Sequence, residues 1–141
     1  MTGITGQCLC GAVRYRADVA SLDAHACHCG KCRRWTGGPA LCLEHDGAIS
    51  FEGSEHIKVY PSSEWAERAF CAVCGSALYW RLQGTSYYSL SAGTIDDQSH
   101  LRFARQIFID DKPSYYDFAN ATEMLTGEQV VAAFNADNPT E

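Results

Sequence analysis

Short apolar runs, alternating or continuous and bounded by turn residues, dominate this chain of 141 residues. Alternation of apolar and polar side chains has the two-residue period of a half-buried β-strand. Groups of glycine, proline, aspartate and serine separate the runs, as turns between strands require. The pattern predicts strands at residues 12–17, 24–28, 40–45, 48–52, 56–60, 67–71, 77–82, 87–92 and 102–110.

One segment, residues 126–135, has a helical period instead. Thr126 and Gln129 are spaced as a capping box, in which each side chain bonds the backbone N–H near the other residue. The apolar face of this predicted helix is formed by Val130, Val131 and Phe134.

The order of these segments predicts the fold class. Many short strands without alternating helices indicate a mainly β fold of antiparallel strands with a short C-terminal helix. The dipeptide Asp46-Gly47 lies between two predicted strands and predicts a hairpin at that point.

Composition indicates a small globular protein. We expect one β-domain over residues 1–120, which would bind zinc, and a tail over residues 121–141 that carries the helix. No apolar run is long enough to cross a bilayer, so no membrane association is expected. The net charge of −6 argues against nucleic acid as a partner.

Eight cysteines suggest the chemistry of this protein. Cys42 stands alone in a predicted strand, where a small buried side chain is expected. Two thiolates separated by one or two residues can reach one cation from a tight turn, and soft sulfur donors suit Zn²⁺. The other seven cysteines form three such clusters, Cys8-x-Cys10, Cys27-x-Cys29-x-x-Cys32 and Cys71-x-x-Cys74.

Disulfides are the competing explanation for an even number of cysteines. Residues 1–6 contain no basic or apolar stretch of the kind that begins a secretory signal, which favours a reducing cytoplasm. Cysteines one residue apart, such as Cys8 and Cys10, cannot bond to each other without strain. Metal binding is therefore the better interpretation.

Spacing permits two partitions of these seven cysteines. In the first, Cys29 and Cys32 join Cys71 and Cys74 in a zinc ribbon, and three cysteines are left over. The second uses every clustered cysteine and gives two groups, a closed four-thiolate site and an open three-thiolate site. Those groups are Cys8, Cys10, Cys71 and Cys74, and Cys27, Cys29 and Cys32.

Alternation also assigns directions around the central cluster. In an extended segment Cys27 and Cys29 point to one side and His28 to the other, so His28 is expected to pack rather than bind metal. Cys32 would return from a turn after Gly30. Three basic residues crowd this predicted turn and offer contacts to carboxylates of a substrate. They are Lys31, Arg33 and Arg34.

Four ordered motifs resemble the family of glutathione-dependent formaldehyde-activating enzymes, which includes centromere protein V. The resemblance covers roughly residues 3–118. The motifs are Gly6-Gln7-Cys8-Leu9-Cys10-Gly11-Ala12-Val13-Arg14-Tyr15, Cys27-His28-Cys29-Gly30-Lys31-Cys32-Arg33-Arg34 with Gly37, Arg68-Ala69-Phe70-Cys71-Ala72-Val73-Cys74-Gly75-Ser76-Ala77-Leu78, and Gly93-Thr94-Ile95-Asp96.

This resemblance implies a β-tent fold and the second partition of the cysteines. It implies a structural zinc on Cys8, Cys10, Cys71 and Cys74, and a catalytic zinc on Cys27, Cys29 and Cys32. The implied activity is that of a carbon–sulfur lyase that condenses formaldehyde with glutathione. A small thiol and a small aldehyde are then the expected partners.

An open three-thiolate zinc site fits that chemistry on physical grounds. The metal can hold an incoming thiol as thiolate and polarise a carbonyl, and both effects favour hemithioacetal formation. Three thiolates reduce the Lewis acidity of zinc, which argues against water activation. The alternative is a non-catalytic, zinc-stabilised β-domain that binds another protein.

Overall fold

A computed structural model of the chain describes residues 1–137. The chain forms two compact units, and each contains segments that are distant in sequence. The first unit comprises Met1–Asp23 and Cys42–Arg102. The second comprises Ala24–Leu41 and Phe103–Glu141, of which residues 138–141 lie outside the described part of the chain.

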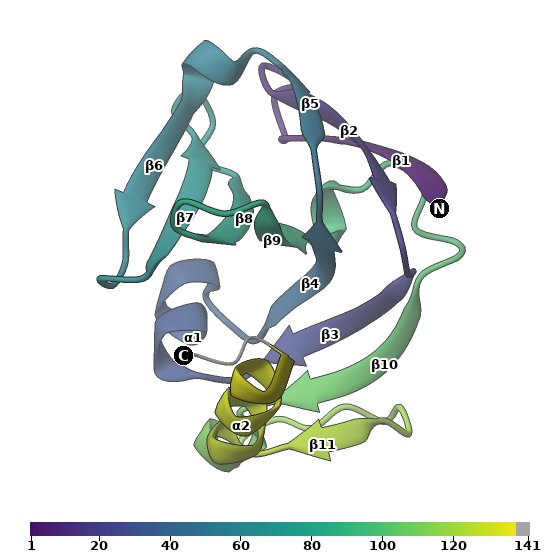
Figure 1. The fold of residues 1–141 in the computed structure, drawn as a ribbon, viewed down its shortest axis with the longest axis vertical. Coiled ribbons are helices and arrows are strands. Elements are labelled where there is room, and N and C mark those ends of the chain that lie inside the picture. Colours follow the sequence, from purple (N-terminus) through teal and green to yellow (C-terminus); the bar gives the residue numbers. More distant parts are fainter. Residues whose placement is uncertain (138–141) are drawn as a thin grey trace. The chain divides into compact units, whose positions relative to one another are not determined.

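A three-stranded antiparallel sheet belongs to the first unit (Figure 1). The middle strand, β2 (Arg14–Val19), alternates strictly between exposed and buried positions, as its sequence predicts. Its neighbours are β1 (Thr2–Gln7) and β5 (Ile49–Glu52). The strand β1 was not predicted from the sequence.

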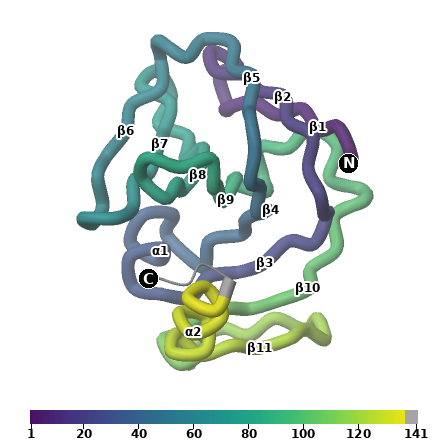
Figure 2. Tube along the Cα trace, in the orientation of Figure 1, coloured from purple at the N-terminus to yellow at the C-terminus, as the bar shows by residue number. Residues whose placement is uncertain are grey.

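The first unit also contains a run of antiparallel strands, hydrogen-bonded in the order β4-β9-β8-β7-β6. Figure 2 traces how β6 to β9 follow one another along the chain. Short 3₁₀ helices η1 (Ser54–His56) and η2 (Ala92–Thr94) connect parts of this unit. The strands are β4 (Ala40–Asp46), β6 (Ile57–Pro61), β7 (Ala66–Cys71), β8 (Ala77–Leu82) and β9 (Tyr87–Ser91).

The hydrophobic core of the first unit is formed by side chains from both sets of strands. Val13 and Val19 are fully buried, as are Leu43, Leu78 and Leu90. Burial of apolar surface of this kind is the main favourable contribution to folding. Cys8 and Cys71 belong to the same core cluster. The two turns that carry Cys8 and Cys10, and Cys71 and Cys74, are called knuckles, and each is anchored in the core by its first cysteine.

The second unit holds the remaining elements. Strand β10 (Arg102–Ile107) lies between β3 (Asp23–Cys27) and the short strand β11 (Glu123–Leu125), which pairs with β10 in parallel. The helical elements are α1 (Gly30–Thr36), the 3₁₀ helix η3 (Ile109–Asp111) and α2 (Gly127–Asp137).

The mainly β fold class and the C-terminal helix are confirmed. The capping box forms as predicted: the Thr126 N–H donates to Gln129 Oε1 at 2.8 Å, and the Gln129 N–H donates to Thr126 Oγ1 at 3.2 Å. On the predicted apolar face, Val130 is half-buried, while Val131 and Phe134 are exposed.

The predicted hairpin at Asp46-Gly47 is wrong. Strand β4 pairs with β9, and β5 pairs with β2, so the two strands around this dipeptide belong to different sheets. A tight hairpin turn of this kind needs a left-handed residue, whereas Gly47 has a φ of 159°, close to the extended limit of that region. Instead, the Ser86 hydroxyl donates to the Asp46 carboxylate at 2.6 Å.

The strand predicted at residues 102–110 ends earlier, at Ile107. Phe108 has a left-handed φ of 53°, which breaks the extended backbone and starts η3. The predicted turn after Gly30 is also wrong, because residues 30–36 form helix α1. Gly37, with a φ of 85°, ends that helix with a left-handed cap.

Among residues 1–137, no helix has both the length and the apolar character needed to span a bilayer.

Candidate metal centres

Two matching knuckles present the first group of cysteines. In each knuckle a glycine with left-handed φ follows the second cysteine: Gly11 has a φ of 78° and Gly75 a φ of 80°. The Gly11 N–H donates to the carbonyl of Cys8 at 3.2 Å, and the Gly75 N–H donates to that of Cys71 at 2.7 Å. Each turn therefore closes on its own first cysteine.

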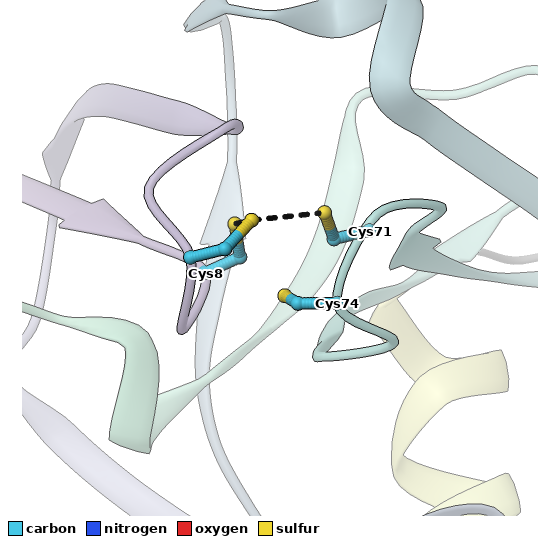
Figure 3. A group of neighbouring side chains, drawn as sticks. Cys8, Cys71 and Cys74 are labelled. Atoms are coloured by element: carbon cyan, nitrogen blue, oxygen red, sulfur yellow. Dashed lines mark hydrogen bonds between the residues drawn. The ribbon is translucent and has the colours of Figure 1, made fainter.

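These knuckles bring the sulfurs of Cys8, Cys10, Cys71 and Cys74 within 4.8 Å of one another. The Cys8 and Cys10 sulfurs are 3.7 Å apart, and the Cys10 and Cys71 sulfurs are 3.9 Å apart. Figure 3 shows the sulfurs of Cys8, Cys71 and Cys74 pointing toward one another. Zn–S bonds of about 2.3 Å in a tetrahedron place sulfurs about 3.8 Å apart, so the donors fit a closed zinc site.

Hydrogen bonds to the sulfurs favour thiolates, whereas burial and the neighbouring thiols oppose them. The Val13 N–H donates to the Cys8 sulfur and the Ala12 N–H to the Cys10 sulfur, each at 3.4 Å. Hydrogen bonding from Ser76 lowers the pKa of Cys74 to about 5. The Ala12 N–H lowers the pKa of Cys10, but desolvation and the neighbouring thiols together raise it to about 11. A dication would relieve this competition between adjacent sulfurs.

Three cysteines of the second unit form the other group, and their sulfurs also lie within 4.8 Å of one another. Cys27 ends β3, Cys29 caps the N-terminus of α1, and Cys32 lies in the first turn of that helix. The Cys32 N–H donates to the Cys29 sulfur at 3.4 Å. Cys27 and Cys32 are buried while Cys29 is half-buried, so the group is open to solvent on the Cys29 side.

The electrostatics of this group also favour a cation. Hydrogen bonding with Cys29 and Cys32, together with burial, raises the pKa of Cys27 strongly. Three adjacent sulfurs cannot all ionise unless positive charge lies between them. Soft sulfur donors in this arrangement fit Zn²⁺, with a fourth position left for water or substrate.

None of the eight cysteines, which all lie in the described part of the chain, forms a disulfide, and the seven clustered ones group as the second of the two partitions left open by their spacing. Cys42 is 8% exposed and lies outside both groups, as expected for a small buried side chain.

His28 lies outside the donor groups, as the alternation of side chains predicts. Its side chain is fully buried. Nδ1 lies 2.8 Å from the Tyr116 hydroxyl and Nε2 lies 2.9 Å from Gln106 Oε1. Sequence patterns identified neither Gln106 nor Tyr116. The aromatic and polar residues after residue 102 carried no spacing signal that linked them to a cysteine cluster.

The three basic residues near this group differ in their surroundings. Arg33 is half-buried and donates through Nε to the carbonyl of His28 at 2.9 Å. Lys31 and Arg34 are exposed on α1. Arg33 is therefore engaged with the protein backbone, whereas the other two side chains face solvent.

Comparison with known proteins finds relatives of this chain. A protein of Schizosaccharomyces pombe described as an uncharacterized lyase is 36% identical over 127 residues, which cover 89% of this chain and 93% of that protein. A Halomonas elongata protein named "Putative glutathione-dependent formaldehyde-activating enzyme" is 32% identical over 85 residues, 54% of each chain.

A solved structure supports the fold. A crystal structure of a Rhodobacter sphaeroides protein matches with a TM-score of 0.57 and 23% identity, covering 65% of this chain and 87% of that one. The sequence profile of one family matches residues 3–111, a span that holds both cysteine groups. The chain belongs to the family of glutathione-dependent formaldehyde-activating enzymes.

Proposed function

We propose that this protein is a zinc-dependent carbon–sulfur lyase. It would join glutathione or a similar thiol to formaldehyde or another small aldehyde, and would also catalyse the reverse reaction. The family and the names of the relatives support this class of reaction. The observation that carries the proposal is the open group of three cysteines, in which Cys29 is the most accessible.

Each cysteine group has a separate role in this proposal. Four thiolates saturate a tetrahedral zinc and would serve the fold, whereas three would leave a position for chemistry. Zinc held by Cys27, Cys29 and Cys32 would supply a lower pKa to a bound thiol and polarisation to an aldehyde carbonyl. Eight cysteines without a disulfide suit a reducing compartment such as the cytoplasm.

In this proposal the basic residues of α1 help to bind and orient the substrates. Lys31 and Arg34 are exposed on α1, which begins at the Cys29 cap, so their charges can meet the carboxylates of a thiol such as glutathione. Arg33 stays a predicted substrate contact, and its Nε also donates to the carbonyl of His28. It would hold the loop between Cys27 and Cys29.

The reaction is an addition without change of oxidation state. The thiol sulfur forms a bond to the carbonyl carbon, the π bond of the carbonyl breaks, and the thiol proton ends on the oxygen. The reverse step restores thiol and aldehyde. Bringing two small molecules together in one orientation is the main contribution expected of such a site.

Replacing one open-site ligand tests this function. Cys29→Ala is expected to reduce zinc from two ions to one per chain and to abolish catalysed hemithioacetal formation, measured by exchange NMR with formaldehyde and glutathione. Cys42→Ala is the matched control, because Cys42 is a buried cysteine outside both groups. Unchanged catalysis in Cys29→Ala, with one zinc lost, would rule out the proposed mechanism.

A second candidate, a protein-binding module, is favoured by the knuckle tips. Leu9 is 86% exposed and Val73 is 61% exposed, and each lies between the two cysteines of its knuckle. If these two side chains belong to one contiguous apolar patch, that patch would be a candidate protein interface. A wild-type rate equal to the uncatalysed background, with glutathione and with several other thiols, would support the module instead of the lyase.

A further inference from the structure

Residues that follow the part of the chain matched by the family contact His28, which lies between two cysteines of the open group. The match ends at residue 111, whereas the second compact unit continues with the segment 112–122. Two hydroxyl groups of this segment, those of Tyr116 and Thr122, belong to a hydrogen-bonded chain that reaches His28. His28 is the residue between Cys27 and Cys29.

Each polar atom of His28 has a partner. Its backbone N–H donates to the carbonyl of Ile107 at 3.1 Å, and its carbonyl accepts from Arg33 Nε at 2.9 Å. Its ring nitrogens face Tyr116 and Gln106. Since the side chain is fully buried, losing any one of these bonds would leave a polar atom unsatisfied away from water.

The bonds around the ring have a consistent direction. Gln106 donates through Nε2 to the Thr122 hydroxyl at 3.0 Å, so its Oε1 is the atom that faces His28. His28 Nε2 therefore carries the proton and donates to that oxygen. Nδ1 of the neutral ring is then an acceptor, and the Tyr116 hydroxyl donates to it. In this arrangement the amide oxygen of Gln106, which can only accept, places the proton on His28 Nε2, and the Tyr116 hydroxyl is the donor that satisfies Nδ1.

Tyr116, at one end of this series of hydrogen bonds, is held by contacts that do not involve the cysteines. Lys112 Nζ lies 2.7 Å from the Asp117 carboxylate, donates to the Pro113 carbonyl at 3.0 Å, and lies 5.1 Å from the centre of the Tyr116 ring. The Tyr116 ring also stacks on His28, with ring centres 5.5 Å apart. The hydroxyl of Tyr116 is thus held in place by its own segment.

We propose that Tyr116 and Thr122 are positioning residues for the open three-thiolate group, acting through His28. Cys27 and Cys29 flank His28, so a rotation of the His28 backbone would move both sulfurs. Groups that support metal ligands typically change metal affinity by about 10- to 100-fold when they are removed. This inference rests on the proposed function, since it assumes that Cys27, Cys29 and Cys32 bind metal.

One hydroxyl separates the test variant from the wild type. Tyr116→Phe keeps the ring that stacks on His28 and removes only the donor to Nδ1. Tyr115→Phe is the matched control, because that neighbouring tyrosine is 77% exposed. In Tyr116→Phe, competition with a metal-binding dye should show the second metal bound about 10- to 100-fold more weakly. The metal affinity of the four-thiolate site is the internal reference and should be the same in Tyr116→Phe and wild type. Tyr115→Phe should bind both metals with wild-type affinity.

Cobalt substitution gives a spectroscopic readout. The thiolate-to-cobalt absorption of the weaker site should shift or lose intensity in Tyr116→Phe, because its sulfurs are less well placed. Thr122→Val should produce a smaller change in the same direction, since it acts through Gln106. Wild-type affinity and wild-type cobalt spectra in both variants would overturn the positioning role.

Amide hydrogen exchange separates failure of this inference from failure of the proposed function. In a Cys29→Ala background, which removes a ligand of the second site, Tyr116→Phe should still speed exchange in a peptide covering residues 24–34, by about tenfold or more. If wild-type protein binds no second metal, the proposed function fails and exchange alone decides the positioning role. Unchanged exchange in this background would contradict the inference directly.

Discussion

The two cysteine groups differ in how far apart their ligands lie along the chain. In the four-cysteine group, Cys10 and Cys71 are 61 residues apart, and Cys8 and Cys71 belong to the hydrophobic core. The three-cysteine group takes all of its sulfurs from residues 27–32. A metal that joins distant segments stabilises the fold, whereas one held within a short segment can bind or leave with less effect on the rest of the chain.

The largest expected effect is on the four-cysteine group. Cys71→Ser should abolish the cooperative thermal transition measured by circular dichroism. Structural zinc contributes about 10–16 kcal/mol in small peptides, as much as the whole stability of a domain, about 5–15 kcal/mol. Cys42→Ala should cost only about 1 kcal/mol, a common value for point substitutions. A Cys71→Ser protein with a normal melting temperature would show that this group does not support the fold.

Graded removal of metal should distinguish the groups in a single sample. If both groups bind zinc as proposed, increasing chelator should remove the first zinc together with the proposed lyase activity, while the circular dichroism spectrum remains that of the folded protein. The second zinc should leave only at a chelator concentration roughly tenfold or more higher, together with unfolding, because four thiolates hold it. Cys29→Ala should lack the first step. Release of both ions in one step that coincides with unfolding would show that the two groups do not differ in their contribution to stability.

The smallest effects concern the arginines of the open group. Arg33→Gln should lower the free energy of unfolding by about 1 kcal/mol, because the carbonyl of His28 loses a charged donor. Arg34→Gln should leave stability unchanged and raise the KM for glutathione by about 1.4- to 5-fold, as expected for an exposed ion pair worth about 0.2–1 kcal/mol. Thermal melts and steady-state kinetics of both variants measure the two effects. Equal effects of the two substitutions would contradict their separate roles.

Hydrophobic alternation predicted most of the strands because side chains on a half-buried sheet must alternate. The strand predicted at residues 77–82 has the observed bounds of β8, and that at residues 40–45 ends one residue before β4 does. Strand β1 lacked the signal because two of its six residues are glycine. Its structure comes from pairing along its whole length with β2. Strand β11 has only three residues, too few for any periodic pattern.

Candidate site residues were predictable where spacing constrains them. The knuckles were recognised from the cysteine spacings, and the left-handed φ of Gly75 after the last of them is a finding of the structure. Spacing alone left two partitions open, since it does not say which knuckles meet. The contacts of His28 with Gln106 and Tyr116 join residues 78 and 88 positions apart, and no local pattern encodes such pairs. Helix α1, with seven residues, was too short for a periodic signal.

The order of the cysteines also has a consequence for synthesis on the ribosome. The three-cysteine group is complete once residue 32 has emerged, whereas the knuckle that begins at Cys8 must wait until Cys74 is translated. At translation rates of about 5–20 residues per second, the thiols of Cys8 and Cys10 spend several seconds without those of Cys71 and Cys74. During that interval the nascent chain is exposed to oxidation and to competing metals, so cellular zinc supply would govern how much of this protein matures.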